Sequence, residues 1–232
     1  MKTAKVLFVL AMGALTLGSA IASGAFYERN AYCEIGDLDL GWIENDDELV
    51  AYKPVIYLYP EETMQVSVTV EPNGGFTCTY PAYNGGWNVT ASPDGTLSAA
   101  DGREFGCLFW EGRIDMPCSF SEGFCVKGED TAQFLEWALT EQGLNARERS
   151  DFIIYWLPQM QDNPYNIIAF QGEPYENAAP LCASPAPDSI KRVFMTYRRA
   201  EAPVDIPAQK LSGFDRTGFA VLEWGGACVD AE

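Results

Sequence analysis

Strand patterns separated by turn signals dominate residues 51–118. The segment 64–70 (MQVSVTV) alternates between apolar and polar side chains, which places four apolar residues on one face. An Asn-Gly pair at 73–74 predicts a hairpin turn into the next strand. The strands predicted in this half are 55–59, which Pro54 and Pro60 confine to a short strand, and 64–70, 76–80, 86–91 and 105–110. Regular turns without a helical period favour an antiparallel β-sandwich-like half.

The hydrophobic period changes to that of helices beyond residue 130. The segment 131–142 (TAQFLEWALTEQ) has its apolar residues at helical spacing. Asp130 and Gln133 match a capping box at its start, and Asn145 with Glu148 predict a second, short helix in the same way. Two helices are therefore expected in the second half of the chain.

An apolar block follows these helices. FIIYWL at 152–157 is rich in β-branched and aromatic residues and is ended by Pro158, so we expect a buried strand. Further strands are expected at 165–170, 192–197 and 218–224. The predicted fold class is α+β: an antiparallel β-sandwich-like N-terminal half, followed by two helices packed on a mainly antiparallel sheet.

Residues 1–22 match a signal peptide. Lys2 and Lys5 supply a positive start, 6–17 form an apolar core, and Ala-Ile-Ala at 20–22 fits the rule for cleavage. The apolar run is shorter than the roughly 20 residues of a membrane-spanning helix, and an uncleaved N-terminal anchor is the alternative. We expect a secreted, periplasmic or cell-surface protein with no membrane span in its mature chain.

Composition divides the mature chain into three parts. Residues 23–50 are polar and acidic and are expected to form an extended arm. Residues 51–118 are expected to form a β-rich subdomain and residues 119–228 an α+β subdomain. We expect the two subdomains to pack as one unit.

The overall composition excludes several classes of protein. The chain has 232 residues, no histidine and a formal net charge of −18. Without imidazole, neither a Ser-His-Asp triad nor a Cys-His pair can form, and most catalytic zinc sites are excluded. The negative charge argues against nucleic acid as a partner, because phosphates need cationic side chains. Any enzyme built on this chain depends on carboxylates, Lys, Tyr or Cys.

Seven cysteines lie beyond the signal peptide. In an exported chain cysteines favour disulfides, and an odd number leaves at least one thiol unpaired or joined to another chain. Their spacing does not decide the pairing, although Cys118 with Cys125 and Cys78 with Cys107 are candidate pairs. The chain has no Cys-x-x-Cys motif, so neither a thioredoxin-type site nor a zinc ribbon is predicted.

Four sequence blocks carry a family resemblance: KPVIYLYP (53–60), YNGGWNVTASPDGT (83–96), LFWEG (108–112) and EWGG (223–226). With their surroundings they resemble a family of uncharacterised bacterial proteins, largely of exported or surface type. The resemblance spans nearly all of 53–226 and implies that 51–228 form one unit. It implies no activity, substrate or catalytic residue, because none is established for that family.

Two carboxylates beside tryptophans are the candidate catalytic residues. Glu111 follows Trp110, and Glu223 precedes Trp224, each at the end of a hydrophobic strand. Desolvation against an aromatic wall raises the pKa of a carboxylate, and two carboxylates about 5–10 Å apart can hydrolyse glycosides without histidine. The competing interpretation is that each carboxylate is exposed to water at a strand end.

Aromatic rings are the basis of a glycan-binding hypothesis. Tyr80, Tyr83 and Trp87 flank a Gly-rich turn, and Trp110 and Trp224 accompany the two carboxylates. Rings with a polar tip suit the faces of sugars. The competing interpretation is core packing, because large rings are mostly buried.

No metal or cofactor is predicted. Asp37, Asp39 and Glu48 fall near ligand positions of a calcium-binding loop, but Trp42 stands where that loop needs glycine. A solvated acidic arm is the better interpretation of these charges.

The sequence leaves two functional hypotheses. The first is a non-catalytic binding or cell-surface module whose partner is a glycan or a cell-surface polymer. The second is a histidine-independent hydrolase of glycans or peptides that uses Glu111 and Glu223 as paired carboxylates. The positions of these two residues in the fold distinguish the hypotheses.

Overall fold

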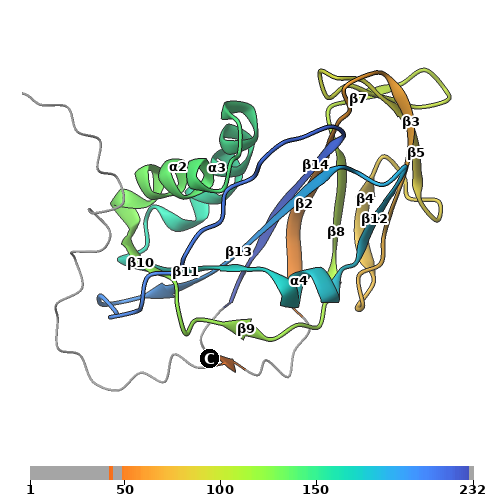
Figure 1. Cartoon of the computed structure of the whole chain (residues 1–232). Helices are drawn as coiled ribbons and strands as arrows, with labels where there is room; N and C mark the ends of the chain where they lie inside the picture. Colours follow the sequence, from red (N-terminus) through yellow and green to blue (C-terminus); the bar gives the residue numbers. More distant parts are fainter. Residues whose placement is uncertain (1–41, 44–48, 230–232) are drawn as a thin grey trace, which may run out of the picture.

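The computed structural model describes residues 42–43 and 49–229, which form two packed β-sheets and a small two-stranded sheet, with the two longest helices on one face of the larger sheet (Figure 1). The predicted signal peptide at 1–22 lies outside the described residues. Asp37, Asp39 and Glu48 of the acidic arm also lie outside them.

The larger sheet has seven strands and is mainly antiparallel. Its neighbouring strands run antiparallel except β13 and β14, which are parallel. In spatial order the strands are β10 (Phe124–Lys127), β11 (Tyr165–Gln171), β13 (Ser189–Ala200), β14 (Ala220–Cys228), β2 (Leu49–Tyr59), β8 (Leu108–Ile114) and β4 (Phe76–Tyr80).

The smaller sheet has five antiparallel strands and packs face to face on the larger one. Val66, Val68 and Val70 point inward from it, which confirms the alternation predicted for 64–70. They meet Ile56 and Val221 of the larger sheet in one apolar core. In spatial order the strands are β12 (Leu181–Ser184), β3 (Met64–Val70), β5 (Trp87–Ala91), β6 (Leu97–Ser98) and β7 (Glu104–Phe105).

Helices cover the other face of the larger sheet (Figure 1). Phe134, Phe152 and Trp156 pack from two helices onto sheet residues such as Trp224 in a second apolar core. This arrangement confirms the α+β class, with two helices on a mainly antiparallel sheet. The helices on this face are α2 (Thr131–Glu141) and α3 (Ala146–Met160), and η1 (Gly128–Asp130) directly precedes α2. The short helix α4 (Glu173–Ala178) instead contributes Tyr175 and Ala178 to the core between the sheets.

One of the two predicted capping boxes is present. Asn145 accepts a hydrogen bond from the Glu148 N–H at 3.0 Å, and the Glu148 carboxylate accepts one from the Asn145 N–H at 2.7 Å. The box predicted at Asp130 is wrong, because this side chain makes no capping bond. Asp130 ends the short helix η1 and has helical backbone angles, whereas a capping residue needs an extended conformation.

The segment 152–157 is helical, and the predicted strand is wrong. It lies within α3, where Phe152 and Trp156 are buried one turn apart and Ile154 is 72% exposed. A buried stripe at positions i and i+4 is helical spacing. Pro158 falls in the last turn, where its missing N–H removes a single hydrogen bond and does not end the helix.

The Asn-Gly pair at 73–74 connects the two sheets, so the predicted hairpin is wrong. β3 pairs with β5 and β12, whereas β4 pairs with β8. Asn73 bonds the backbone of Asp115 through both ends of its amide, at 2.8 Å each. A Cβ on Gly74 would lie 2.7 Å from the Arg113 carbonyl oxygen, so the glycine here permits close approach of two backbones.

The two halves of the chain contribute to the same sheets. β2, β4 and β8 come from the first half, and the remaining strands of the larger sheet come from the second. β12 of the second half joins the smaller sheet beside β3. The expected boundary at 118/119 falls inside β9 (Cys118–Ser119), which pairs with β1 (Trp42–Ile43).

Five cysteines carry free thiols in the described part of the chain: Cys78, Cys107, Cys118, Cys125 and Cys182. Both candidate disulfides are therefore wrong. Cys78 lies opposite Glu111 in the sheet, four residues along the strand from Cys107. At about 3.3 Å per residue this separates the two positions by ~13 Å, beyond the ~7 Å that a disulfide spans between Cα atoms.

Candidate functional site

Glu223 lies on β14 in the core between the two sheets and is fully buried. Its carboxylate accepts a hydrogen bond from Trp110 Nε1 at 2.9 Å and forms an ion pair with Arg192 on the neighbouring strand β13. The Arg192 guanidinium also lies over the Tyr175 ring, 4.5 Å from the centroid. Burial lowers the pKa of Arg192, but Glu223 and Tyr175 outweigh this effect and raise it. Glu223 is thus the counter-ion of a buried cation.

Glu111 lies on the opposite face of the same sheet. Side chains alternate along β8: Leu108 and Trp110 belong to the core between the sheets, so Phe109 and Glu111 face the helix side. Since Glu223 shares its face with Trp110, the sheet separates the two carboxylates. Glu111 and Glu223 do not form the converging pair that carboxylate hydrolases use.

Most of the aromatic residues predicted to bind ligand belong to the core. Trp87, Trp110 and Trp224 are buried, and Trp87 Nε1 donates to a backbone carbonyl at 2.8 Å. Tyr83 is half-buried, and its hydroxyl bonds to the backbone of β3. Tyr80 is the exposed member of this set, with 59% of its surface open to solvent.

A patch on the helix side of the larger sheet is partly open beside α3. It combines side chains from β2, β8 and α3, which we call the open strip: Tyr52, Lys53, Phe109, Glu111 and Tyr155. Tyr80 lies opposite Phe109 in the sheet register, next to the strip, and its ring packs edge-on against Phe105 of β7 at 5.5 Å between centroids. The strip therefore contains one predicted catalytic residue and adjoins the exposed member of the predicted aromatic set.

Lys53 has an unusual backbone conformation within the strip. Its φ angle is 60°, and it lies where the register of β2 shifts against both neighbouring strands. The Lys53 N–H donates to Glu111 Oε1 at 3.2 Å. A non-glycine residue with positive φ costs on the order of 1–3 kcal/mol, and such residues cluster at functional sites. The irregular strand thus places an ammonium group and a carboxylate together on one open face.

The Lys53 ammonium group in the strip lies close to two aromatic rings. Lys53 Nζ lies 5.5 Å from the centroid of the Phe109 ring and 5.7 Å from that of Tyr155. Burial raises the pKa of the Tyr155 hydroxyl, and the nearby Glu111 and Tyr52 raise it further. The Tyr155 hydroxyl is therefore neutral and able to donate a hydrogen bond at physiological pH.

A thiol and a carboxylate lie next to the strip. The Tyr57 hydroxyl donates to Asp151 Oδ2 at 3.0 Å, and burial, together with Cys107 and Asp151, raises its pKa. Burial also raises the pKa of the Cys107 thiol, and the positive charge of Lys53 opposes this only in part. Cys107 therefore stays protonated near neutral pH and lacks the thiolate character of a nucleophile.

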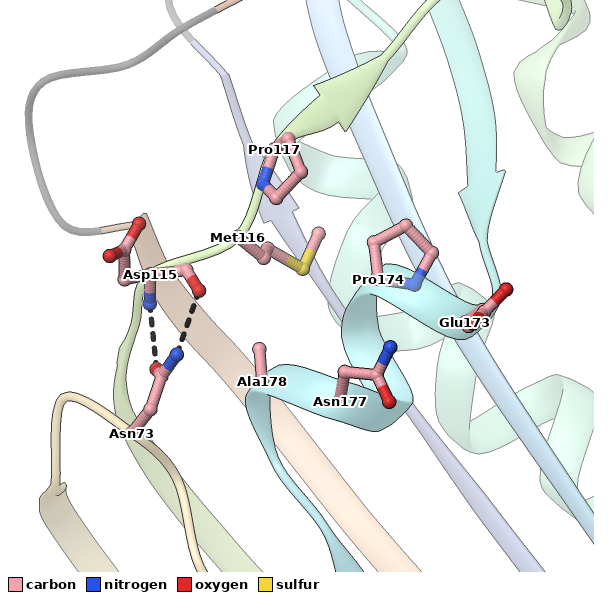
Figure 2. Close-up of a pocket in the computed structure, with 8 residues that line it drawn as sticks. All are labelled: Asn73, Asp115, Met116, Pro117, Glu173, Pro174, Asn177 and Ala178. Atoms are coloured by element: carbon pink, nitrogen blue, oxygen red, sulfur yellow. Dashed lines mark hydrogen bonds between the residues drawn. The ribbon is translucent and has the colours of Figure 1, made fainter.

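A pocket of about 320 Å³ lies between α4 and the segment 115–117 that links β8 to β9. Figure 2 shows that Asn73 is already committed to the backbone of Asp115. In the same view the carboxylates of Asp115 and Glu173 stand at the rim and point away from Met116. The volume is near the lower limit of about 300 Å³ for ligand pockets, and few polar groups converge in it. The open strip is therefore the better candidate site.

Two further observations concern only the described residues. No group of three or more His, Cys, Asp or Glu side chains among them is arranged to hold a metal ion. Within the same residues, no helix combines the length and the apolar character needed to cross a membrane.

The sequence interpretation missed Lys53, Phe109 and Tyr155 as members of a site. Lys53 is the charged residue of the KPVIYLYP block, and its position before a proline at the start of an apolar strand was the available signal. Tyr155 belongs to the block predicted to be a buried strand, so its role depended on recognising α3.

Comparison with known proteins finds a short similarity. The chain is 44% identical over 63 residues to a Butyrivibrio fibrisolvens protein called "Uncharacterized protein in bglA 3'region". The match covers 26% of this chain and 65% of that protein, slightly less than two thirds of its length. No protein-family model matches the chain, and no solved structure shows significant similarity to it.

Proposed function

We propose that this protein is an exported, non-catalytic binding module that holds a glycan or another cell-surface polymer on the open strip. Export is supported by the signal peptide predicted at 1–22. The observation that carries the binding role is the grouping of Tyr52 and Tyr155 with the ammonium of Lys53 and the carboxylate of Glu111 on an open face.

The strip matches a sugar in two respects. Tyr52, with 40% of its surface exposed, offers a ring against which the C–H face of a pyranose can pack. Glu111 accepts a hydrogen bond from the Lys53 backbone N–H through Oε1. Its other oxygen, Oε2, has no partner among the described residues and can accept a hydrogen bond from a sugar hydroxyl. The neutral Tyr155 hydroxyl donates in the other direction. Rings and hydrogen-bonding groups together favour a polyhydroxylated ligand.

The hydrolase hypothesis receives less support from the geometry. Its two carboxylates lie on opposite faces of the sheet, and Glu223 is fully buried against Arg192. A carboxylate acid–base pair has to flank one substrate bond, at a separation of about 5–10 Å in an open site. Binding without catalysis is therefore the function that we propose.

A glycan array that includes bacterial cell-wall polymers tests this proposal. The wild-type chain is expected to bind at least one class of glycan, and Tyr52→Ala and Tyr155→Ala are each expected to weaken that binding about tenfold, or ~1.4 kcal/mol. Tyr52→Phe, which keeps the ring, should retain most of the affinity.

Ile154→Ala is the matched control, because Ile154 is exposed on the same helix and lies outside the strip. It should bind like the wild type. An array without hits for the wild-type chain would refute the glycan as ligand. Equal losses in Tyr52→Ala and Ile154→Ala would show that the strip is not the site.

A further inference from the structure

Strand β4 forms one outer edge of the seven-stranded sheet. Its five residues, FTCTY, pair with β8 on one side. On its other side no strand of the described chain pairs with it, and Thr77, Cys78 and Tyr80 are exposed. An unpaired edge presents backbone N–H and C=O groups that a further strand can complete.

The other sheet edges carry features that prevent such pairing. β10 ends in the exposed Lys127, β12 lies between Pro180 and Pro185, and β7 has two residues, of which Glu104 is exposed. Charge, proline and short length all protect an edge strand against a second chain. β4 has five uncharged residues, and a proline borders it at one end only, where Pro81 follows Tyr80. Its register against β8 shifts between Phe76 and Cys78, so Cys78 is the first residue beyond this irregularity.

We propose that β4 pairs antiparallel with β4 of a second copy of this chain, about a two-fold axis at Cys78. The two larger sheets then form one continuous sheet across the axis. Cys78 lies directly opposite the partner's Cys78, and the two Cα atoms are about 4.5–5.5 Å apart. This distance falls within the ~4.4–6.8 Å range of disulfides.

This pairing avoids charge repulsion although each chain carries a formal net charge of −18. β4 has no charged residue. The carboxylate to consider is that of Glu111, which lies opposite Cys78 on the adjacent strand β8. Strands are spaced by about 4.8 Å, so the two Glu111 positions are three spacings, or ~14 Å, apart. That separation exceeds the Debye length of ~8 Å at physiological salt.

The symmetry also places the two open strips on one side of the assembly. An axis at the edge of a continuous sheet runs perpendicular to it, so the helix-side faces of both copies point in the same direction. Two strips on one face can contact the same polymer, which increases avidity without any new contact at either strip. The dimer itself depends on β4 and not on the proposed glycan site.

A disulfide between the two copies traps the dimer. When oxidised glutathione is the oxidant, the two Cys78 thiols lose two hydrogens and one S–S bond forms between the chains. The glutathione disulfide breaks, takes up the two electrons and two protons, and leaves as two thiols.

The test is oxidation of the full chain with glutathione disulfide, followed by non-reducing electrophoresis and sedimentation velocity. The 25.5 kDa wild-type chain is expected to give a species of twice this mass. Cys78→Ser should give no covalent dimer on the non-reducing gel under the same conditions, because it keeps the β4 edge but lacks the thiol that traps the dimer. Cys182→Ser, which removes another exposed thiol on a protected edge, should dimerise like the wild type.

A double variant, Thr77→Cys with Cys78→Ser, tests the register. Residue 77 is also exposed, but about the proposed axis the two positions lie ~8 Å apart, outside the ~7 Å limit of a disulfide. Its dimer should therefore form at least tenfold more slowly than that of the wild type. Equal rates would show unspecific coupling of exposed thiols and overturn the proposal. A wild-type chain that stays monomeric, or a Cys78→Ser variant that forms as much covalent dimer as the wild type, would overturn it as well.

Discussion

Replacing Arg192 by methionine is expected to destabilise the protein strongly. The substitution leaves the Glu223 carboxylate, which is fully buried, with Trp110 as its remaining side-chain donor. A buried charge that loses its partner costs about 3–5 kcal/mol. The lost contact with the Tyr175 ring adds up to about 2 kcal/mol. Because domains of this kind are stable by about 5–15 kcal/mol in total, the variant should lose a large share of its stability.

Urea unfolding followed by tryptophan fluorescence measures this loss, and thermal unfolding should show a melting temperature lower by roughly 6–28 °C. The double variant Arg192→Met with Glu223→Gln removes both charges and keeps an acceptor for Trp110. It should recover most of the lost stability, because a neutral pair has no charge to desolvate. A single variant that loses less than about 1 kcal/mol, or a double variant no more stable than the single one, would refute the reasoning.

Three further predictions concern stability. Arg216→Met should cost about 3–5 kcal/mol in urea unfolding, because it leaves the buried Glu148 at the start of α3 without its cation; a loss below ~1 kcal/mol would contradict this role. Gly74→Ala should cost about 1–3 kcal/mol, since the new methyl group lies 2.7 Å from a backbone oxygen. Gly213→Ala, whose methyl group would lie 3.5 Å from the nearest atom, should unfold like the wild type. Burial raises the pKa of Tyr57 above its unfolded value, so Tyr57 contributes stability below about pH 10 that is lost as the pH rises through the folded-state pKa. Tyr57→Phe should therefore flatten the decline of the unfolding free energy at alkaline pH. An unchanged slope would contradict this role of Tyr57.

Local signals in the sequence predicted those elements whose cause is local. The alternation of 64–70 and the Asn145 capping box both appear as expected, because each depends on residues close together in the chain. The failure at 152–157 has a physical explanation. Ile, Tyr and Trp favour strands by propensity, but the upstream cap starts a helix, and the burial of Trp156 under the sheet stabilises it.

Local sequence signals could not predict which distant strands pair with each other. The turn at 73–74 resembles a hairpin turn, yet the strands on either side belong to different sheets. β4 pairs with β8 instead of β3, because this pairing lets the apolar side chains of the two sheets meet in one core. The same non-local choice leaves Cys78 on a free edge, four residues along the strand from the position of Cys107.

The sequence by itself determined the α+β class, the two helices and the exclusion of imidazole chemistry, because these follow from local periodicity and composition. The short strand predicted between Pro54 and Pro60 was wrong, because β2 begins at Leu49 and runs through Pro54. It presented Glu111 and Glu223 as equivalent, each beside a tryptophan at a strand end. Tertiary structure decided their difference: strand pairing buries Glu223 against Arg192 between the sheets and leaves Glu111 beside Lys53 on the open strip. The physical reason is that alternation along a strand assigns side chains to two faces, and only the packing of sheets and helices decides which face is closed to water.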